Sequence, residues 1–379
     1  MQNTLSHRRL SLCFVAHNAY GALAGLDTGH IGGIERQQSL MAHWLADQGY
    51  DVSMITWDEG QGDCEVGRVK VFALGRRDSG LPGLRFFHPR WTGLNNAMKR
   101  ADADIYYYNC GDLALGQIAS WAGRHGKKTV YSIASEPDCD PALPSLKQWR
   151  ERILYRYGLR NTDQVIAQTQ RQQEMLRDGF DIHAEVIPMP CSGFGAEEPD
   201  DVEGPTQQHI LWVGRFSQEK RLEWLLDVAE ALPQYIFDVA GASNARTEYA
   251  RTLLKRSESI PNVILHGRLV HRDLGVLYHR AHLLCCTSTF EGFPNTFLEA
   301  WSVGRPIIST FDPDGVITRQ GLGKSVCTVN ELYNGITAFM EDQRVWQESS
   351  SAAQVYFNTY HTLEAVMPRF VQLFQRIVA

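Results

Sequence analysis

The sequence has no apolar stretch near the roughly 20 residues that a membrane-spanning helix requires. It has no Cys-x-x-Cys pair and no His-Glu-x-x-His motif, so the usual spacings of zinc ligands are absent. It also lacks an excess of positive charge: the formal net charge is -6, with a neutral N-terminal half and an acidic C-terminal half. We therefore expect no membrane-spanning segment, no metal site and no nucleic-acid partner, which would need a net basic face.

Several cysteines, including Cys13, Cys285 and Cys286, lie inside apolar strand-like runs, which favours a reducing cytoplasm. The N-terminus imitates a secretory signal, because the basic segment 7–9 precedes the apolar run 10–16. That run is short, polar residues interrupt it, and a Gly-rich loop and a helical pattern follow. We interpret it as the first β-strand of a cytoplasmic protein.

At 379 residues the chain exceeds one ordinary hydrophobic core, which predicts two domains. From residue 10 onward, short β-branched or aromatic runs alternate with helical periodicity, as in the βαβ units of a parallel sheet. The pattern predicts a helix over 34–48 and strands over 12–16, 52–56, 105–108, 129–133 and 164–167.

Residues 188–205 are rich in proline, glycine and acids, and we place a linker there. The βαβ rhythm then restarts, with a predicted helix over 222–232 and strands over 209–213, 235–240, 263–265, 283–287 and 306–309. A predicted C-terminal helix over 363–378 has an apolar stripe that must pack on another element. The sequence thus predicts an α/β protein of two similar halves.

The segment 289–300 follows a predicted strand and leads into a short helix, at the edge where open α/β sheets bind ligands. Backbone N–H groups at that helix start would face an anion, and Glu291 and Glu299 can both point toward the same ligand. Ionised carboxylates accept hydrogen bonds from adjacent hydroxyls. The alternative is that Thr296 and Glu299 form a capping box, with no ligand.

A basic pair follows the first strand of the second half. Arg215 and Lys220 are separated by a loop that can bring both cations to one diphosphate, Arg215 as a fork and Lys220 as a point charge. Alternatively, Lys220 is a solvated residue at a helix start, although a cation there opposes the helix dipole. We favour the phosphate-binding interpretation.

The first strand-to-helix turn runs from Gly29 through His30 and Ile31 to Gly32 and Gly33. Two glycines before a helix permit close approach of a ligand to the backbone. The turn lacks the G-x-G-x-x-G spacing of dinucleotide-binding folds, so it indicates little by itself.

These motifs together resemble the family-4 retaining glycosyltransferases: the Gly-Gly-x-Glu-Arg turn, the Gly-Arg-x4-Lys cluster, the Glu-Gly-Phe-Pro segment ending in Glu299-Ala300, and Gly304-x-Pro306-Ile307-Ile308. They occur in the family's order and span most of the chain. The resemblance implies a GT-B architecture, two facing Rossmann-like domains with parallel sheets and an interdomain cleft. It also implies a retaining, metal-independent hexosyltransferase with no cofactor beyond its nucleotide-sugar donor. The implied domains are an acceptor domain over 1–190, a donor domain over 191–360, and a helix over 361–379 that crosses back to the first domain.

By this resemblance, Arg215 and Lys220 hold the donor diphosphate and stabilise the leaving group, Glu299 holds the ribose, and Glu291 contacts the transferred sugar. The implied donor contacts continue over the loop after Glu291, and its members are Gly292, Phe293, Pro294, Asn295 and Thr296. Gly32 and Gly33 would approach the phosphates or the acceptor from the other domain.

The sequence departs from the family at two places. The family often has a histidine near the donor sugar after the strand equivalent to 130–133, where this chain has Ser135, Glu136 and Asp138. These residues either contact the sugar or acceptor or form a surface turn. The glycine pair often found after the Pro-Ile-Ile strand is replaced by the segment 312–315.

Residues 147–160 contain five basic residues and one acid, interleaved with aromatic and aliphatic residues. This composition fits an amphipathic helix on an anionic membrane surface, or a solvated helix with one packed face. The expected partners are a nucleotide-sugar donor and a glycan or lipid-linked acceptor, and a peripheral membrane contact is expected only under the first of these two interpretations of 147–160.

We expect transfer of a sugar in cell-surface polysaccharide synthesis, in the cytoplasm, and at the inner face of the membrane if 147–160 binds lipid. The alternatives are a catalytically inactive nucleotide-sugar-binding homologue, or a sugar-nucleotide epimerase or phosphorylase of the same fold.

Overall fold

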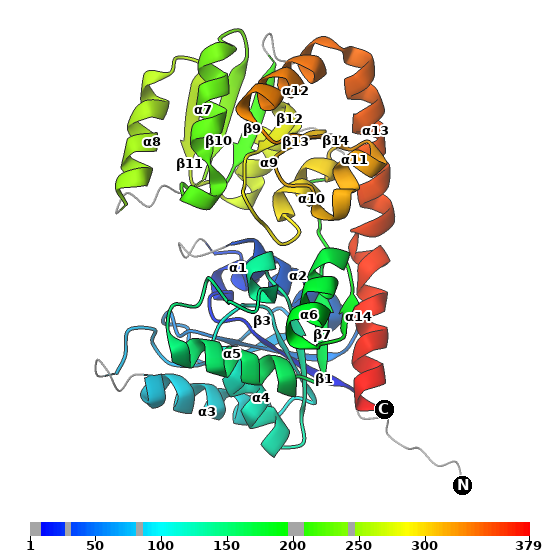
Figure 1. Cartoon of the computed structure of the whole chain (residues 1–379). Helices are drawn as coiled ribbons and strands as arrows, with labels where there is room; N and C mark the ends of the chain where they lie inside the picture. Colours follow the sequence, from blue (N-terminus) through cyan, green and yellow to red (C-terminus); the bar gives the residue numbers. More distant parts are fainter. Residues whose placement is uncertain (1–8, 27–31, 81–85, 196–207, 242–246) are drawn as a thin grey trace. The chain divides into compact units, whose positions relative to one another are not determined.

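The computed structural model describes residues 9–26, 32–80, 86–195, 208–241 and 247–379. The chain divides into two compact units, each built around its own sheet (Figure 1). The first unit combines Met1–Pro190 with Val366–Ala379, and the second is Cys191–Ala365. Most of the predicted linker and the basic residues at positions 7 and 8 lie outside the described residues. The C-terminal part of the chain rejoins the first unit at Val366, five residues after the predicted boundary at position 361.

The first unit has an eight-stranded sheet in the order β3-β4-β2-β1-β5-β6-β7-β8. Neighbouring strands are parallel except for β3 and β4 at one edge, which are antiparallel and were not predicted. The strands are β1 (Ser11–Val15), β2 (Asp51–Thr56), β3 (Cys64–Val66), β4 (Val69–Ala73), β5 (Ile105–Tyr108), β6 (Lys128–Ser132), β7 (Gln164–Ala167) and β8 (Ala184–Val186). The predicted first strand is confirmed, and all five residues of β1 are buried between β2 and β5.

Alternate residues of a strand point to opposite faces of the sheet, and helices cover the apolar side chains of the first sheet. Cys13 and Val15 of β1 join one buried cluster with residues of α3, α4, α5 and α6. The helices of this unit are α1 (Tyr20–Ala24), α2 (Gly33–Asp47), α3 (Thr92–Ala101), α4 (Ala114–Arg124), α5 (Trp149–Asn161) and α6 (Gln170–Phe180), with short helical turns at Phe86–Trp91 and Glu136–Cys139.

The predicted C-terminal helix is α14 (Leu363–Val378), and its apolar stripe packs on the first unit. Val366, Met367, Phe370, Leu373 and Phe374 are all buried. The rings of Phe370 and Phe374 lie 6.3 and 6.5 Å from the ring of Tyr107 on β5. Burying several large side chains of this kind contributes about 1.5 to 3 kcal/mol each, so α14 is an integral part of the first core.

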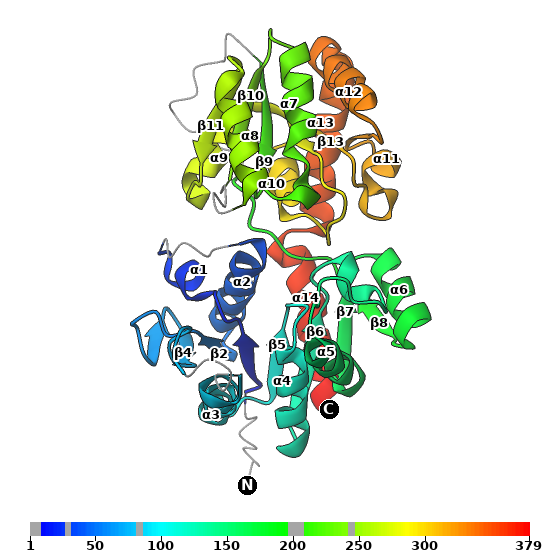
Figure 2. The ribbon, with the colours of Figure 1, turned by 60° about the vertical axis from the view of Figure 1, so that its left-hand side comes forward.

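The second unit has a six-stranded sheet, all parallel, in the order β11-β10-β9-β12-β13-β14. Figure 2 shows its strands between two helical layers. The strands are β9 (His209–Val213), β10 (Ile236–Ala240), β11 (Val263–Gly267), β12 (Ala281–Cys286), β13 (Ile307–Ser309) and β14 (Gly323–Ser325). The predicted α/β class with two parallel-sheet domains is therefore confirmed.

The two faces of this sheet carry separate clusters. Ile210 and Trp212 of β9 pack with α7, α8 and α12, whereas Leu211 between them packs with α9, α10, α11 and α13. The helices are α7 (Leu222–Ala231), α8 (Glu248–Ser259), α9 (His271–Arg280), α10 (Asn295–Ser302), α11 (Val316–Gln320), α12 (Val329–Glu341) and α13 (Gln343–Tyr360), with short turns at Gln218–Lys220 and Pro313–Gly315.

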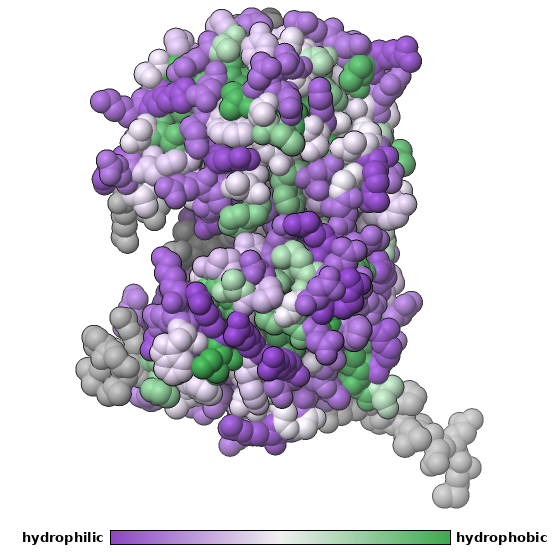
Figure 3. Space-filling model, in the orientation of Figure 1, coloured by the Kyte–Doolittle hydropathy of each residue, from purple (hydrophilic) through white to green (hydrophobic). Residues whose placement is uncertain are grey.

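Hydrophilic side chains cover most of the visible surface of both units (Figure 3). Within the described ranges, every helix is too short or too polar to traverse a lipid bilayer.

Asp238 on β10 is a fully buried carboxylate with three polar partners. One oxygen contacts His209 Nδ1 at 2.7 Å, and the other contacts His266 Nε2 at 2.6 Å and the Arg280 guanidinium at 2.7 Å. Burial alone would raise its pKa, but these hydrogen bonds and the Arg280 charge lower the pKa of Asp238 to about 2. The carboxylate therefore links β10 to β9, β11 and α9.

We predict that Asp238→Asn lowers the free energy of unfolding by about 3 kcal/mol at neutral pH, because Arg280 loses its buried anionic partner. Since the folded pKa lies below the unfolded value, the stabilisation is present above about pH 4 and is lost as the pH falls toward 2. Denaturant titrations from pH 2 to 7 should show a flatter profile for the variant. Asp227→Asn, in a half-exposed pair with Arg256, is the control and should cost less than about 1 kcal/mol. Equal losses for both variants would contradict the assignment.

Candidate functional site

The candidate site of the second unit lies where β9 and β12 end. These strands are parallel neighbours, so the loops after them begin at the same edge of the sheet. The loop after β9 runs from Gly214 to Arg221, and the loop after β12 runs from Thr287 to Pro294. The basic pair and Glu291, which are far apart in sequence, therefore lie on adjacent loops.

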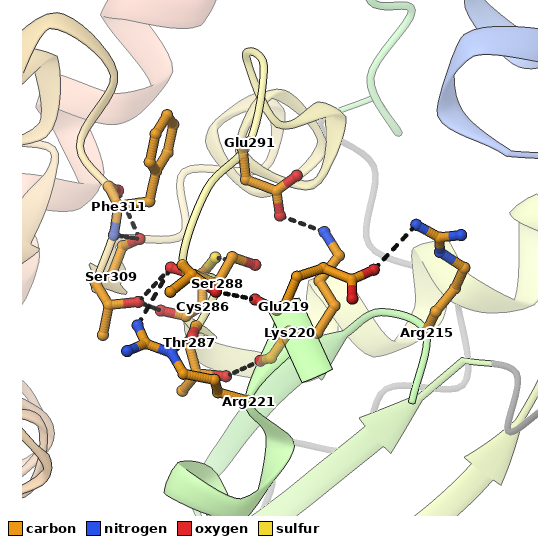
Figure 4. A network of polar contacts seen from close by, with 12 residues as sticks. Arg215, Glu219, Lys220, Arg221, Cys286, Thr287, Ser288, Glu291, Ser309 and Phe311 are labelled. Carbon is orange, nitrogen blue, oxygen red and sulfur yellow. Dashed lines mark hydrogen bonds and ion pairs between the residues drawn. The ribbon is translucent and has the colours of Figure 1, made fainter. Parts of the chain in front are cut away.

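Hydrogen bonds join the two loops (Figure 4). Thr289 donates both its backbone N–H and its hydroxyl to the carbonyl oxygen of Glu219, at 2.8 and 2.9 Å. The Thr287 hydroxyl donates to the carbonyl of Lys220 at 2.6 Å. In return, Arg221 Nε donates to the carbonyl of Thr287 at 2.8 Å. These contacts fix the backbone around Lys220.

A close backbone contact and a positive φ require glycine at the end of β10. A Cβ atom on Gly241 would lie 1.8 Å from the carbonyl oxygen of Gly214, which no side chain could tolerate. Gly241 also adopts a φ of 146°, which is strained for other residues. The close approach holds the start of the basic loop against the neighbouring strand.

Lys220 and Glu291 form an ion pair across the two loops, and their side chains are only 19% and 17% exposed. Because the pair is shielded from water, its attraction is stronger than that of a surface pair. Arg215 is different: its side chain is 75% exposed, and its guanidinium lies 3.4 Å from Glu219. Burial acts to raise the pKa of Glu219, but hydrogen bonds and the Arg215 and Lys220 charges lower it below its usual value. The network thus combines two cations with two carboxylates.

Glu299 lies on α10, where its side chain is 8% exposed. Its Oε2 accepts a hydrogen bond from the Tyr278 hydroxyl at 2.8 Å, and its Oε1 lies 3.8 Å from His271 Nε2. The alternative of a capping box is wrong: α10 begins at Asn295, its N-cap is Pro294, and no side chain caps it. Thr296 therefore lies inside the first turn.

The loop between the two glutamates is well packed. Gly292 and Pro294 are buried, and Asn295 and Thr296 are half-buried in the first turn of α10. The ring of Phe293 lies 5.0 Å from His361 and 6.1 Å from Trp301. Phe290 is 40% exposed, which leaves its ring accessible beside Glu291.

In the first unit, Gly32 and Gly33 form the start of α2. Gly32 is the N-cap, and its N–H donates to Glu35 Oε2 at 3.0 Å. A Cβ on Gly32 would lie 2.7 Å from that oxygen, the end of a flexible side chain that can move aside. Gly29, His30 and Ile31 lie outside the described residues. Contact of this turn with a ligand stays a prediction.

Ser135, Glu136 and Asp138 have local partners at the end of β6. The backbone N–H and hydroxyl of Ser135 donate to Asp138 Oδ2 at 3.0 and 3.1 Å, and Glu136 pairs with Arg171 at 3.0 Å. Asp138 is 6% exposed, so the alternative of a surface turn is wrong for this residue. Burial raises the pKa of Asp138 to about 6. At the second departure from the family, the Asp312 carboxylate accepts a hydrogen bond at 2.8 Å from the N–H of Ile317, in the first turn of α11.

A pocket of about 850 Å³ in the first unit was not predicted. It lies at the carboxyl ends of β1, β2 and β4 and is lined by Asn18, Trp57, Asp58, Glu59, Arg76, Arg77, Asp78 and Ser79. The Trp57 ring stacks on His17 at 5.2 Å. Burial, together with the Arg77 and Arg90 charges, lowers the pKa of His17, which keeps the imidazole neutral at pH 7. The pocket lining therefore combines the aromatic Trp57 with charged and polar residues.

Sequence reasoning also missed Arg221 and Tyr278. Arg221 adopts a left-handed φ of 45° and stacks over Trp224 at 4.1 Å, neither of which a sequence pattern reveals. Tyr278 belongs to α9, and its side chain is fully buried. A buried tyrosine needs a partner for its hydroxyl, but only the packing of α9 beside α10 identifies that partner as Glu299.

Among the residues that the structure describes, no three His, Cys, Asp or Glu side chains are grouped to hold a metal ion.

Two family models match the chain. Residues 32–190 match the glycosyl transferase 4-like domain, and residues 207–342 match glycosyl transferases group 1. Together they cover most of the chain.

Similar proteins agree with these matches. The chain is 28% identical over 176 residues to the GtfA subunit of the UDP-N-acetylglucosamine–peptide N-acetylglucosaminyltransferase of Streptococcus parasanguinis, a match covering 42% of this chain and 33% of that subunit. The chain thus spans about a third of that relative. It is 23% identical over 277 residues to an α-1,4-N-acetyl-D-galactosaminyltransferase of Campylobacter jejuni that acts on an undecaprenol-linked glycan, covering 71% of this chain and 73% of that enzyme. Sucrose-phosphate synthase of Thermosynechococcus elongatus shares the fold, with a TM-score of 0.79, 18% identity, and coverage of 98% and 99% of the two chains.

The family resemblance implies that Glu299 holds the donor ribose. On that basis we predict that Tyr278→Phe weakens nucleoside-diphosphate binding about 3- to 10-fold, because Glu299 loses the hydrogen bond that orients its carboxylate. Isothermal titration calorimetry measures the change. Tyr235→Phe, at another buried tyrosine of the same unit, should bind like the wild type. Unchanged affinity in Tyr278→Phe would show that this orientation of Glu299 does not contribute to nucleotide binding.

Proposed function

The chain belongs to the glycosyl transferases group 1 family, and from this premise we propose that it transfers a hexosyl group from a nucleoside-diphosphate sugar to a glycan or lipid-linked glycan. We propose retention of the anomeric configuration and no metal ion. The observation that carries the proposal is the ion pair of Lys220 with Glu291, beside Arg215, at the ligand-binding edge of the second sheet. This arrangement supplies cations for a diphosphate and a carboxylate for sugar hydroxyls.

The proposed reaction breaks the bond between the anomeric carbon and the diphosphate oxygen, and the electron pair leaves with the diphosphate. A bond forms between the same carbon and an acceptor hydroxyl oxygen, whose proton passes to the departing phosphate. Negative charge develops on the leaving group, so fixed cations stabilise the transition state more than the ground state. Lys220 is suited to this role because the loop-joining hydrogen bonds hold its backbone in place.

In this proposal, the Lys220 ammonium exchanges Glu291 for a phosphate oxygen when the donor binds. Glu291 is then free to accept hydrogen bonds from the transferred sugar, and Glu299 accepts from the ribose. Arg215, whose side chain is largely exposed, adds a second cation to the diphosphate. The streptococcal relative, a UDP-N-acetylglucosamine–peptide N-acetylglucosaminyltransferase subunit, supports a UDP-linked N-acetylhexosamine as the first donor to test. A thermal-shift screen of nucleotide sugars identifies the donor, and binding without transfer across acceptors would favour an inactive homologue.

The pocket beside Trp57 is our proposed acceptor site. A flat aromatic ring with polar neighbours suits a sugar ring, which has one apolar face and a rim of hydroxyls. The undecaprenol-linked acceptor in the name of the Campylobacter relative supports a lipid-linked glycan, and thus a role in polysaccharide synthesis at the inner face of the membrane.

We predict that Lys220→Ala lowers kcat/KM roughly 30- to 1000-fold, a loss of about 2 to 4 kcal/mol in transition-state stabilisation. Arg215→Ala should fall in the same range. Initial rates with the identified donor, measured with and without a chelator, test both the role of the cations and the independence from metal. Lys255→Ala, at an exposed lysine on α8, is the matched control and should keep full activity. Near-wild-type rates in Lys220→Ala would remove the assignment.

For the acceptor pocket, we predict that Trp57→Ala raises the acceptor KM about tenfold through loss of the stacking surface, while the affinity for the donor nucleotide stays the same. Steady-state kinetics with varied acceptor separate the two effects. Trp57→Phe keeps an aromatic ring and should recover most of the loss. If Trp57→Ala weakened donor and acceptor equally, the pocket would not be an acceptor site.

A further inference from the structure

The exposed face of α5 carries large apolar side chains. Trp149, Ile153 and Tyr157 are 75%, 55% and 43% exposed. They are spaced four residues apart, so they form one stripe along the helix. Single exposed apolar residues are common on protein surfaces, but a continuous stripe with a tryptophan at one end is not.

The opposite face of α5 is already packed against its own unit. Tyr155, Gly158 and Leu159 are buried, and Tyr155 donates a hydrogen bond to the carbonyl of Asp138 at 2.9 Å. A Cβ on Gly158 would lie 2.7 Å from the backbone nitrogen of Gly116 on α4, so the two helices touch at their backbones. This close contact fixes the rotation of α5. The stripe therefore stays outward, and a solvated helix with one packed face explains only the buried half.

The exposed charges of α5 are all positive. Arg150, Arg156 and Arg160 are exposed, and the latter two are spaced so that they lie next to the stripe. The single acid of α5, Glu151, is engaged at the helix start, where it accepts from the N–H of Gln148 at 3.0 Å. We define the α5 surface as Trp149, Arg150, Ile153, Arg156, Tyr157 and Arg160.

An aromatic segment extends this surface. The Arg150 guanidinium lies 5.2 Å from the ring centre of Phe86, and the adjacent Phe87 is 61% exposed. Figure 3 shows a small strongly hydrophobic spot over α5, next to hydrophilic side chains. The apolar groups thus protrude among cations rather than lining a groove.

We propose that the α5 surface docks the protein on an anionic lipid bilayer. Tryptophan and tyrosine prefer the membrane–water interface, and isoleucine gains by entering the acyl boundary. Arginine side chains bind lipid phosphates while their apolar stems cover the surface. A protruding stripe on a helix whose exposed charges are cations fits a flat, negatively charged lipid surface better than the concave site a protein partner would need. The inference deepens the proposed function, since it places the enzyme where a lipid-linked acceptor is found.

Vesicle flotation of the full chain tests the proposal. We expect binding to vesicles of phosphatidylcholine with phosphatidylglycerol, and little binding to phosphatidylcholine alone. Arg156→Glu with Arg160→Glu should lower the bound fraction at least about tenfold, as should Trp149→Ser with Ile153→Ser. The matched controls are Arg344→Glu and Val355→Ser on α13, an exposed arginine and a 65% exposed valine of the second unit, and both should bind like the wild type.

Three results would overturn the proposal: retained binding in both α5 double variants, equal loss in the controls, or equal binding to neutral vesicles. The proposal would also be overturned if the wild type bound no vesicles and a stripe variant changed its oligomeric state. The stripe would then contact a second copy of the chain. Donor-nucleotide binding by the same variants should be unchanged. A chain that binds anionic vesicles through α5 but transfers no sugar would refute the proposed function and leave the α5 surface standing.

Discussion

The contact between Lys220 and Glu291 is the interaction on which the candidate site depends. It joins two loops whose residues are 71 positions apart, and both side chains are largely shielded from water. Neither charge would be stable alone in this setting, because an unpaired, poorly hydrated charge costs several kcal/mol. The loops meet because β9 and β12 are neighbours in the sheet, and hydrogen bonds from Thr287 and Thr289 hold them together. An anionic ligand can take the place of the carboxylate without leaving the cation unpaired.

The second unit uses charge in two contrasting ways along β9. At the start of the strand, His209 helps to satisfy Asp238, whose three partners leave it buried and fixed. Just beyond the other end, Arg215 is mostly exposed, with one partner at 3.4 Å. A fully satisfied carboxylate stabilises the fold, whereas an exposed cation held near a shielded one remains available to a ligand. The same strand thus has a structural charge cluster at one end and the candidate site at the other.

The first unit offers two further surfaces, each consistent with a transferase of lipid-linked glycans. The pocket beside Trp57 lies at the carboxyl ends of its strands, as ligand sites of α/β sheets do. The α5 surface lies on a helix whose other face is fixed by the contact of Gly158 with Gly116. The basic, aromatic composition of 147–160 fitted either a membrane helix or a solvated one. The outward direction of Trp149 and Ile153 is what favours the membrane.

The sequence by itself determined the α/β class, the two parallel sheets and most of the elements, because these depend on patterns between residues close in the chain. The strands β5, β7 and β9 and the helix α14 have the predicted bounds, since each is a strongly apolar or periodic segment. The sequence motifs also led to the family. Short edge strands such as β3 carried too few residues to be recognised, and Thr296 matched a capping pattern although the helix begins at Asn295. Only the tertiary structure decided that Tyr278 orients Glu299, that Arg221 holds Thr287, and that Trp57 lines a pocket. Such contacts depend on strand order and helix packing, which bring together residues that no local pattern relates.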